Sequence, residues 1–579
     1  MDQPSPSRPT TMTPLERRRF LALCGAAGLG AAALGALARA AEEAVPVDPE
    51  AIAACEKLAA LEFTGDERAL MARGLAELRE SYRALRAVSI ANGIPPALGF
   101  DPDALLGRRP RARRGDGVTL PAAAAPARPE SDAELAFLPL AALSELVRRR
   151  QVSSVELTGL YLDRLRRHGP RLECVITLTE ERAMTAARRA DREIAAGRWR
   201  GPLHGIPWGA KDLLAVRGYP TTWGAMPYRE QTFDQDAEVV RRLDEAGAVL
   251  VAKLTLGALA WGDVWFGGKT RNPWNLEQGS SGSSAGSAAA TAAGLVGFAL
   301  GSETWGSIVS PSTRCGATGL RPTFGRVGRT GAMALSWSMD KLGPICRSVA
   351  DTALVLDAIH GADPGDPASR TRPFAWRPGR DPSRLRVGFV PALFDEDPDD
   401  EAAREVRVMD REALAVVREL AGELVPLELP ELPVDALSFV LSVEAAAAFD
   451  ELTRSGRDDE LVRQVEQAWP NVFRQARMIP AVEYVQANRV RTMLLRDLER
   501  ALAGVDVFVA PSFAGSHLLM TNLTGHPAVV VPHGFRKDGT PASITFTGRL
   551  WGEAAALTLA EAYQQRTGWH RRHPPGFAS

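Results

Sequence analysis

Strand-like and helix-like segments alternate along most of this chain, and that alternation constrains its fold more than any other feature. From Ala133 onward, short β-rich runs are separated by helical stretches rich in alanine and arginine. Near-continuous apolar strands need cover on both sides, and helices interleaved with them supply it. The pattern therefore predicts an α/β fold in which helices cover both faces of a sheet. The clearest strand-like runs are residues 248–252, 385–390, 505–510 and 528–531.

Residues 45–106 have a purely helical pattern instead. Thr64 and Glu67 have the spacing of a capping box at a helix start. Apolar residues then recur at helical spacing and form one stripe. The members of the stripe are Met71, Leu75, Leu78, Tyr82 and Leu85. We therefore expect a helical N-terminal extension, packed as a hairpin on the main body.

Residues 107–131 are rich in arginine, alanine and proline, and we expect them to link the extension to the main domain, residues 132–575. A basic run at the start of this linker is compatible with a nucleic-acid-binding arm, but such runs in proline-rich connectors are more often simply solvated. The net charge of the whole chain is −1, so nothing indicates nucleic acid as a partner. A homodimer is compatible with the sequence.

Residues 1–40 have the pattern of an export signal. Arg17, Arg18 and Arg19 precede an uncharged run, residues 20–37, which ends at Ala38-Arg39-Ala40. A cationic start, a weakly apolar middle and an A-x-A end are typical of a secretory signal, and paired arginines before Phe-Leu favour the twin-arginine route. A membrane anchor is the alternative, but the run is too rich in glycine and alanine for a good span. We expect a bacterial protein exported to the periplasm or beyond, with no stable membrane span after processing.

Metal binding is not indicated by the cysteines. The five cysteines are scattered along the chain and form no C-x-x-C pair. Neither a zinc site nor a disulfide framework is therefore expected.

Three segments carry the chemical signal. A glycine- and serine-rich run, residues 279–287, leads directly into an alanine-rich stretch, and free N–H groups at such a helix start suit negative charge. A phosphate loop would need a lysine that this run lacks. Ser307 follows Gly306 shortly after a β-like run, where nearby amides can bind an oxyanion. Lys211 lies between an apolar approach and the acidic Asp212.

Together these segments resemble the amidase signature family. The similarity extends from about residue 133 to residue 570, in the expected order. It implies the amidase-signature fold, with a central mixed β-sheet covered by helices on both faces. The segments that carry the resemblance are residues 202–207, Lys211-Asp212, the glycine- and serine-rich run, residues 306–308, Cys315-Gly316 and residues 319–323.

The resemblance also implies roles for individual residues. Ser307 corresponds to the family nucleophile, Ser283 to a bridging serine with a cis peptide bond, and Lys211 to the base. Backbone amides would hold the oxyanion, and Ser284 would be a supporting hydroxyl that bonds within the loop. The amides are those of Thr304, Trp305, Gly306 and Ser307. Neither a metal nor an organic cofactor is needed for these roles.

The implied chemistry is hydrolysis of a small-molecule amide through an acyl-serine intermediate. Serine is a poor nucleophile until a base takes its proton, and lysine is a base only when neutral. Burial would lower the lysine pKa from about 10.4 in that direction. A histidine base is the competing mechanism. However, none of the four histidines near motif segments has a G-x-S-x-G context. They are His204, His517, His526 and His533.

Three positions depart from the family pattern. Trp305 stands where the family usually has glycine, Glu303 where it has aspartate, and Val309 where it has arginine. In some members that arginine binds a substrate carboxylate, so Val309 favours a substrate that is neutral or apolar on its acyl side. A glycine needed for a positive φ could not be replaced by Trp305 without a change in the turn.

Three functions fit these residues. The first is an amidase, whose substrates could extend to esters, anilides or carbamates. The second is the glutamine-hydrolysing subunit of a tRNA-dependent amidotransferase, against which the export signal counts because that system is cytoplasmic. The third is a catalytically inactive binding protein, against which the presence of all three triad residues counts.

Overall fold

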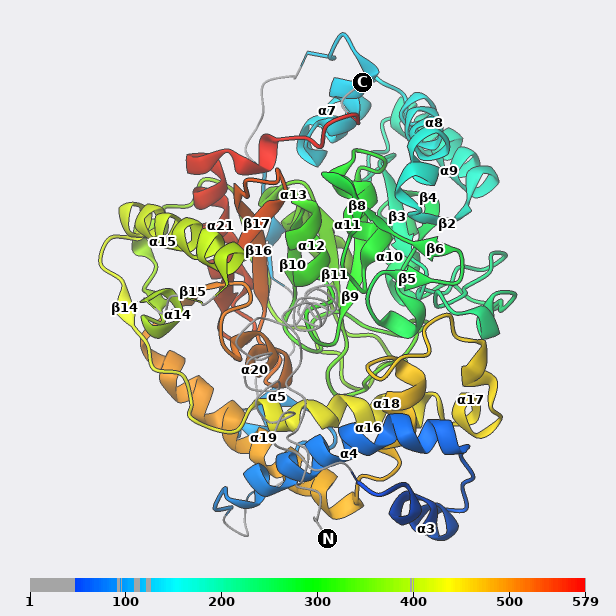
Figure 1. Ribbon diagram of the computed structural model, residues 1–579. Coiled ribbons are helices and arrows are strands. Elements are labelled where there is room, and N and C mark those ends of the chain that lie inside the picture. Colours follow the sequence, from blue (N-terminus) through cyan, green and yellow to red (C-terminus); the bar gives the residue numbers. More distant parts are fainter. Residues whose placement is uncertain are drawn as a thin grey trace, which may run out of the picture.

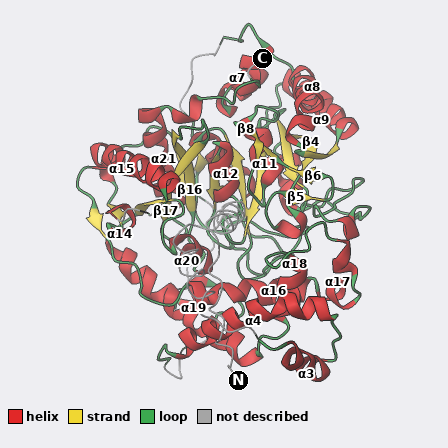
Figure 2. Ribbon diagram, in the orientation of Figure 1, coloured by secondary structure: helices red, strands yellow, loops and turns green. Residues whose placement is uncertain are grey.

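A central sheet with helices on both faces organises the chain, as Figures 1 and 2 show. The computed structural model describes residues 47–90, 94, 96–108, 115–120, 127–395, 398 and 400–577. The expected export signal, residues 1–40, and much of the basic run at the start of the linker lie outside these residues. The main sheet has 11 strands with both parallel and antiparallel neighbours, so the predicted α/β fold with a mixed sheet is confirmed.

The strands include all four runs expected from the sequence, at slightly shifted bounds. Three two-stranded sheets accompany the main one. From one edge to the other, the main sheet consists of β14 (Val425–Pro426), β13 (Val387–Phe389), β15 (Val507–Pro511), β17 (Pro541–Gly548), β16 (Ala528–Phe535), β10 (Thr318–Arg321), β11 (Lys341–Cys346), β9 (Phe298–Glu303), β3 (Pro207–Lys211), β4 (Val249–Leu254) and β2 (Val175–Leu178). The small sheets pair β1 (Gly117–Val118) with β12 (Ala375–Trp376), β5 (Val264–Trp265) with β6 (Gly268–Lys269), and β7 (Arg271–Asn272) with β8 (Asn275–Gly279).

Strand β4 illustrates why the apolar runs fold this way. All six of its residues are buried. Val249 and Val251 belong to one hydrophobic cluster and Leu250 to another, because successive side chains of a strand point to opposite faces. A strand with apolar side chains on both faces is stable only between two helical layers.

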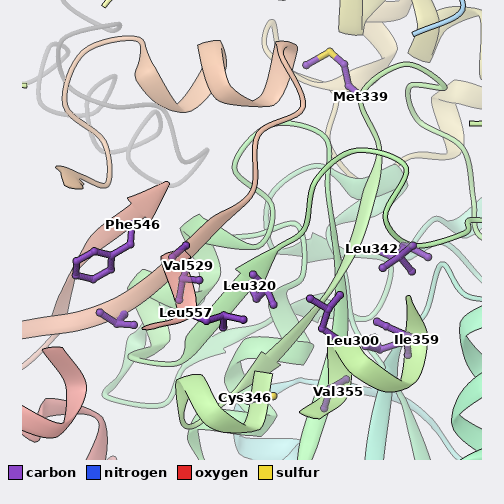
Figure 3. Close-up of a cluster of buried hydrophobic side chains, with 14 of the residues drawn as sticks. Leu300, Leu320, Met339, Leu342, Cys346, Val355, Ile359, Val529, Phe546 and Leu557 are labelled. Carbon is purple, nitrogen blue, oxygen red and sulfur yellow. The ribbon is translucent and has the colours of Figure 1, made fainter. Parts of the chain in front are cut away.

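One helical layer packs its apolar side chains on the face that carries Leu300, Leu320 and Leu342. Figure 3 shows these three residues beside Val355 and Ile359 of a covering helix. Helices of this layer are α10 (Glu238–Glu245), α13 (Val349–Ile359) and α21 (Glu553–Thr567), with α15 (Glu401–Ala421) against α21. The opposite face is covered by α8 (Ser154–Leu172), α9 (Glu180–Ala195), α11 (Ala285–Ala292) and α12 (Val309–Cys315). Shorter helices nearby are α6 (Asp132–Phe137), α7 (Leu140–Arg148), α14 (Ala392–Asp395) and α20 (His517–Leu523).

A separate group of helices lies at one end of the sheet, at the bottom of Figure 1. It combines the N-terminal extension with helices from the second half of the chain. The predicted capping box is present, because Thr64 and Glu67 exchange both hydrogen bonds. Its helices are α3 (Pro49–Ala59), α4 (Gly65–Arg86), α5 (Pro102–Leu105), α16 (Phe439–Ala448), α17 (Asp450–Arg454), α18 (Trp469–Ala476) and α19 (Ala481–Ala501).

The expected linker contains regular structure that the sequence did not indicate. Within residues 107–131, Gly117–Val118 forms β1 and pairs in parallel with β12. None of the helices described here combines the length and apolar character required to cross a membrane.

Candidate active site

The expected base and nucleophile lie where two neighbouring strands of the main sheet reach their carboxyl-terminal ends. Lys211 is the last residue of β3, and Ser307 follows β9 by a short loop. Strands β3 and β9 are parallel neighbours, paired from Trp208–Phe298 to Ala210–Leu300. Since parallel neighbours end at the same edge of a sheet, this topology brings the lysine and the serine loop together.

Three serine hydroxyls surround the amine of Lys211. Its Nζ lies 2.8 Å from the Oγ of Ser283 and 3.0 Å from that of Ser284. The third hydroxyl, 2.9 Å away, belongs to Ser302, which sequence reasoning did not select. The sequence does place a serine just before the end of the strand-like run that forms β9, but it does not show towards which residue the hydroxyl points. The Lys211 side chain has no exposed surface, and these hydroxyls are its hydrogen-bond partners.

The hydroxyl hydrogen of Ser284 is used in a hydrogen bond to another residue, which limits the neighbours that can donate a proton to Lys211. The Ser284 hydroxyl donates to the carbonyl oxygen of Ser302 and accepts from the Ser302 N–H, each at 3.1 Å. Its single proton is therefore used, and towards Lys211 it can only accept. A neutral amine has two hydrogens and one lone pair. The hydroxyl that donates into the lone pair is consequently that of Ser283 or Ser302.

Burial favours the neutral form of this amine. Desolvation lowers the pKa of Lys211 well below its ordinary value, and it outweighs the raising influence of the Asp340 and Glu303 charges. Neither carboxylate forms an ion pair with Lys211 in the part of the chain that the structure describes. Lys211 is therefore placed to accept a proton.

The loop with Ser283 meets the loop with Ser307 through their backbones. The peptide bond between Gly282 and Ser283 is cis, as the family resemblance implies. The Ser284 N–H donates to the carbonyl oxygen of Ser307 at 3.2 Å. The Ser307 hydroxyl itself has no hydrogen-bond partner among the described residues and is half-buried. The structure thus joins the nucleophile loop to the relay loop through this backbone bond and leaves the Ser307 hydroxyl without a partner among the described residues.

The loop after β9 presents unpaired backbone N–H groups. Those of residues 304–307 have no hydrogen-bond partner within the described segments, whereas the next two are occupied. Gly306 has a φ of 80°, and Trp305 is not among the residues with positive φ. The replacement of the family glycine by Trp305 therefore needs no strained backbone, because Gly306 makes the turn. Free N–H groups of this kind can bind an oxyanion.

Glu303 closes this loop from inside the protein. Its carboxylate accepts from the N–H groups of Ile308 at 2.8 Å and Val309 at 2.9 Å. It also accepts from Arg321 at 2.7 Å and Asn522 at 2.9 Å. Burial opposes ionisation of Glu303, but Arg321 and the hydrogen bonds outweigh it and lower its pKa. An ionised Glu303 consequently fixes both ends of the loop that displays Ser307.

An apolar wall flanks the nucleophile loop. Val309 is fully buried and packs with Leu518 and Val530, while Trp305 and Phe513 cover the cluster and keep some exposed surface. Leu518 reaches Gly306, because a Cβ on that glycine would lie 3.4 Å from a Leu518 methyl group. The position at which the family usually has arginine is therefore part of a buried hydrophobic cluster.

Asp212 does not act on its neighbour Lys211. Its carboxylate lies 2.5 Å from the Nζ of Lys253, which is as buried as Lys211, and accepts from Thr222. Although the two residues adjoin in the sequence, the Asp212 carboxylate is therefore not a partner of the Lys211 amine. Asp212 pairs with a lysine on the adjacent strand β4.

The four histidines near the motifs have partners away from Ser307. His204 lies against Glu193, and His517 lies against the Pro511 carbonyl oxygen. His526 lies against Glu499, and His533 lies against Asp410. Over the residues that the structure describes, no group of three or more His, Cys, Asp or Glu residues is arranged to hold a metal ion.

Known proteins resemble this chain over most of its length. The model of the Amidase family matches residues 156–518. A glutamyl-tRNA(Gln) amidotransferase subunit from Moorella thermoacetica is 35% identical over 486 residues, which cover 76% of this chain and 99% of that protein. An amidase of Pseudomonas putida is 34% identical over 470 residues, which cover 76% of this chain and 98% of that protein.

A solved structure agrees in fold. The native peptide amidase from Stenotrophomonas maltophilia superposes with a TM-score of 0.66 at 31% sequence identity. The match covers 77% of this chain and 100% of the peptide amidase. The sheet and the loops that surround Lys211 therefore lie in a fold shared with enzymes that cleave amides.

Proposed function

Because this chain belongs to the amidase family and is an amide hydrolase, we propose that it cleaves the amide C–N bond through an acyl-Ser307 intermediate, with Ser283 as proton relay and Lys211 as base. The observation that carries the proposal is the buried amine of Lys211, whose partners are hydroxyls alone. Burial favours the neutral form of such an amine, and we assign Ser283 rather than Ser302 as the hydroxyl that passes the proton to it, because Ser283 is the bridging serine that the family resemblance implies.

The first half of the reaction forms the acyl-enzyme. The Ser307 oxygen attacks the carbonyl carbon, its proton passes to the Ser283 oxygen, and the Ser283 proton passes to Lys211. The carbonyl oxygen becomes an oxyanion held by the free N–H groups of residues 304–307. When the C–N bond breaks, the nitrogen leaves with the bonding electrons and receives the proton from Lys211 through Ser283. The acyl group remains on Ser307.

The second half repeats the transfer with water. A water molecule attacks the acyl carbon, and its proton reaches Lys211 through Ser283. The bond between the acyl carbon and the Ser307 oxygen breaks, and that oxygen regains a proton from the relay. The acid is released and the lysine is neutral again.

We propose a neutral, apolar acyl group for the substrate. The exposed side of the wall is formed by Trp305 and Phe513, which cover the buried side chains of Val309, Leu518 and Val530. A carboxylate placed against it would lose its hydration without gaining a cation from this wall. Anilides, esters and carbamates share the same acyl chemistry and differ in the leaving group.

A second candidate is the glutamine-hydrolysing subunit of a tRNA-dependent amidotransferase. The 35% identity with the Moorella thermoacetica protein favours it. Glutamine carries a carboxylate on its acyl side, which the Val309 wall does not complement. Export by the signal expected in residues 1–40 would also separate this chain from a cytoplasmic partner. Co-purification with partner subunits and tRNA, together with glutaminase activity, would support this candidate instead.

A fluorophosphonate tests the nucleophile directly. It should attach to Ser307, located by peptide mass spectrometry, and Ser307→Ala should abolish labelling. Attachment to another serine would contradict the proposal. A panel of alkyl, aryl and carboxylate-bearing amides then tests the acyl preference, with glutamine included for the second candidate.

A further inference from the structure

The N-terminal extension packs on α18, a helix that borders the active-site loops. The extension itself lies outside residues 156–518, which the family model matches. The Asn471 amide of α18 donates to the Leu70 carbonyl oxygen of α4 at 3.1 Å. Arg474 of α18 is almost fully buried and pairs with Glu67 of α4 at 2.6 Å. Helices α4 and α18 lie side by side in Figure 1. The extension therefore contributes to the position of α18, together with α16 and the Asp458 carboxylate, which also pairs with Arg474.

Helix α18 in turn holds a strained turn. Leu259 and Ala260 have φ values of 51° and 62°, a conformation that side chains other than glycine rarely adopt. Such residues persist only where their surroundings hold them in place. The Leu259 N–H donates to the Trp223 carbonyl oxygen, and the indole N–H of Trp469 donates to the Leu259 carbonyl oxygen, each at 2.9 Å. Trp469 also packs edge-to-face on Trp261, with ring centroids 4.5 Å apart.

The far end of the same turn touches the loop that carries Ser283. The Asp263 carboxylate accepts from the Ser281 N–H at 3.1 Å. The Gly262 carbonyl oxygen lies so close to Gly282 that a Cβ there would come within 1.9 Å of it. Ser281 and Gly282 directly precede Ser283, so a shift of the turn reaches the relay serine through backbone contacts.

We propose that Trp469 is a positioning residue of the active site, and that helix α4 of the N-terminal extension sets its position through α18. The inference rests on the proposed function, since it assumes that Ser283 relays protons for Ser307. Loss of the indole hydrogen bond releases the Leu259 carbonyl oxygen and lets the strained turn relax. The relay hydroxyl then loses its alignment, while the apolar acyl wall remains intact.

Trp469→Phe tests the hydrogen bond while it keeps an aromatic ring. We expect kcat and the rate of fluorophosphonate labelling at Ser307 to fall about tenfold, with KM nearly unchanged. Trp376→Phe is the matched control, because the buried indole of Trp376 donates to Thr558 at 3.2 Å and contacts none of these loops. Equal losses in both variants, or an unchanged kcat for Trp469→Phe, would overturn the proposal.

Gly74→Val tests the role of the extension without touching the turn. A Cβ at Gly74 would lie 2.1 Å from the Gln475 side-chain amide of α18, so valine displaces that amide and breaks its hydrogen bond to the Met71 carbonyl oxygen of α4. Gly65→Val is the control on the same helix, because a Cβ at Gly65 has no atom within 4 Å. We expect several-fold slower labelling for Gly74→Val alone. A lower melting temperature with an unchanged labelling rate would refute the link to the site.

Wild-type labelling separates the two hypotheses. If the wild-type chain does not react at Ser307, the proposed function fails. If the wild type reacts and both Trp469→Phe and Gly74→Val react at the same rate, only the positioning role fails.

Discussion

Two buried lysines on neighbouring strands have different surroundings. Lys211 ends β3, and Lys253 lies opposite Ala210 on the parallel strand β4, where both amines are fully buried. Lys253 faces the Asp212 carboxylate at 2.5 Å, whereas Lys211 faces three hydroxyls. Burial lowers the pKa of both; it is opposed at Lys253 by the Asp212 carboxylate in direct contact, and at Lys211 by the charges of Asp340 and Glu303, which form no ion pair with it. The chemical nature of the group that contacts the amine, rather than its depth of burial, therefore distinguishes a lysine that can act as a base from one that stabilises the fold.

Replacement of Lys211 should have the largest effect on activity, which Lys253 is not expected to support directly. Without the amine, Lys211→Ala leaves no acceptor for the proton of Ser307. We expect kcat/KM to fall by about 10³-fold, within the range of general base catalysis. Steady-state kinetics on an activated anilide measures the fall, and circular dichroism checks that the variant is folded. Near-normal turnover would exclude Lys211 as the base.

Replacement of Lys253 should affect stability rather than chemistry. Lys253→Met leaves the Asp212 carboxylate buried without its ion-pair partner, which should cost about 3–5 kcal/mol of unfolding free energy. Urea unfolding of the variant beside wild type measures the loss. Addition of Asp212→Asn should restore part of it, because the unpaired charge is removed. Loss of turnover comparable to Lys211→Ala, in protein that remains folded, would erase the distinction between the two lysines.

The sequence was sufficient to predict much of the site because its key residues lie in short motifs. The strand-like runs, the capping box of α4 and the cis bond before Ser283 were all anticipated. Local patterns encode such features, since each depends on residues that are close in the chain.

The partners of those residues could not be predicted, because they come from distant segments. Lys253 reaches Asp212 only because β3 and β4 pair in parallel with a particular register. The Ser302 hydroxyl turns to Lys211 at the end of β9, and the Glu303 carboxylate folds back onto two amides of the next loop. Trp469 meets the Leu259 turn from a helix that the sequence alone did not relate to the site.

The pH dependence of activity should sharpen the comparison further. The pKa of Lys211 in the folded protein lies well below its ordinary value of about 10.4, so the base becomes neutral as pH rises through that lowered value. We expect kcat/KM to rise with pH along this acid limb and to level off before the ordinary lysine pKa. A limb with its midpoint near 10.4 would mean that Lys211 is hydrated rather than buried.

Stability should respond to pH with the same sign. Between the lowered folded pKa and the unfolded pKa, the unfolded chain binds a proton at Lys211 that the folded protein does not bind. The contribution of Lys211 to stability is therefore present above the unfolded pKa and is lost as pH falls through the folded pKa. The stability of wild type relative to Lys211→Met should consequently increase with pH across this window. A difference that does not vary with pH would contradict the lowered pKa.

Removal of one hydroxyl group that contacts each lysine amine should give the smallest effects. Ser284→Ala takes away an acceptor for Lys211 and a bond to each backbone group of Ser302, but leaves Ser283 in place. We expect kcat/KM to fall about tenfold, as for one or two hydrogen bonds of about 1 kcal/mol, and far less than in Ser283→Ala. Thr221→Val is the counterpart for Lys253, whose Nζ lies 3.0 Å from the Thr221 hydroxyl. It should leave kcat/KM unchanged within about twofold, because that lysine takes no part in proton transfer. If Ser284→Ala were as inactive as Ser283→Ala, the hydrogen-bond assignment that excludes Ser284 as the relay would be wrong, since it makes Ser284 only an acceptor towards the amine.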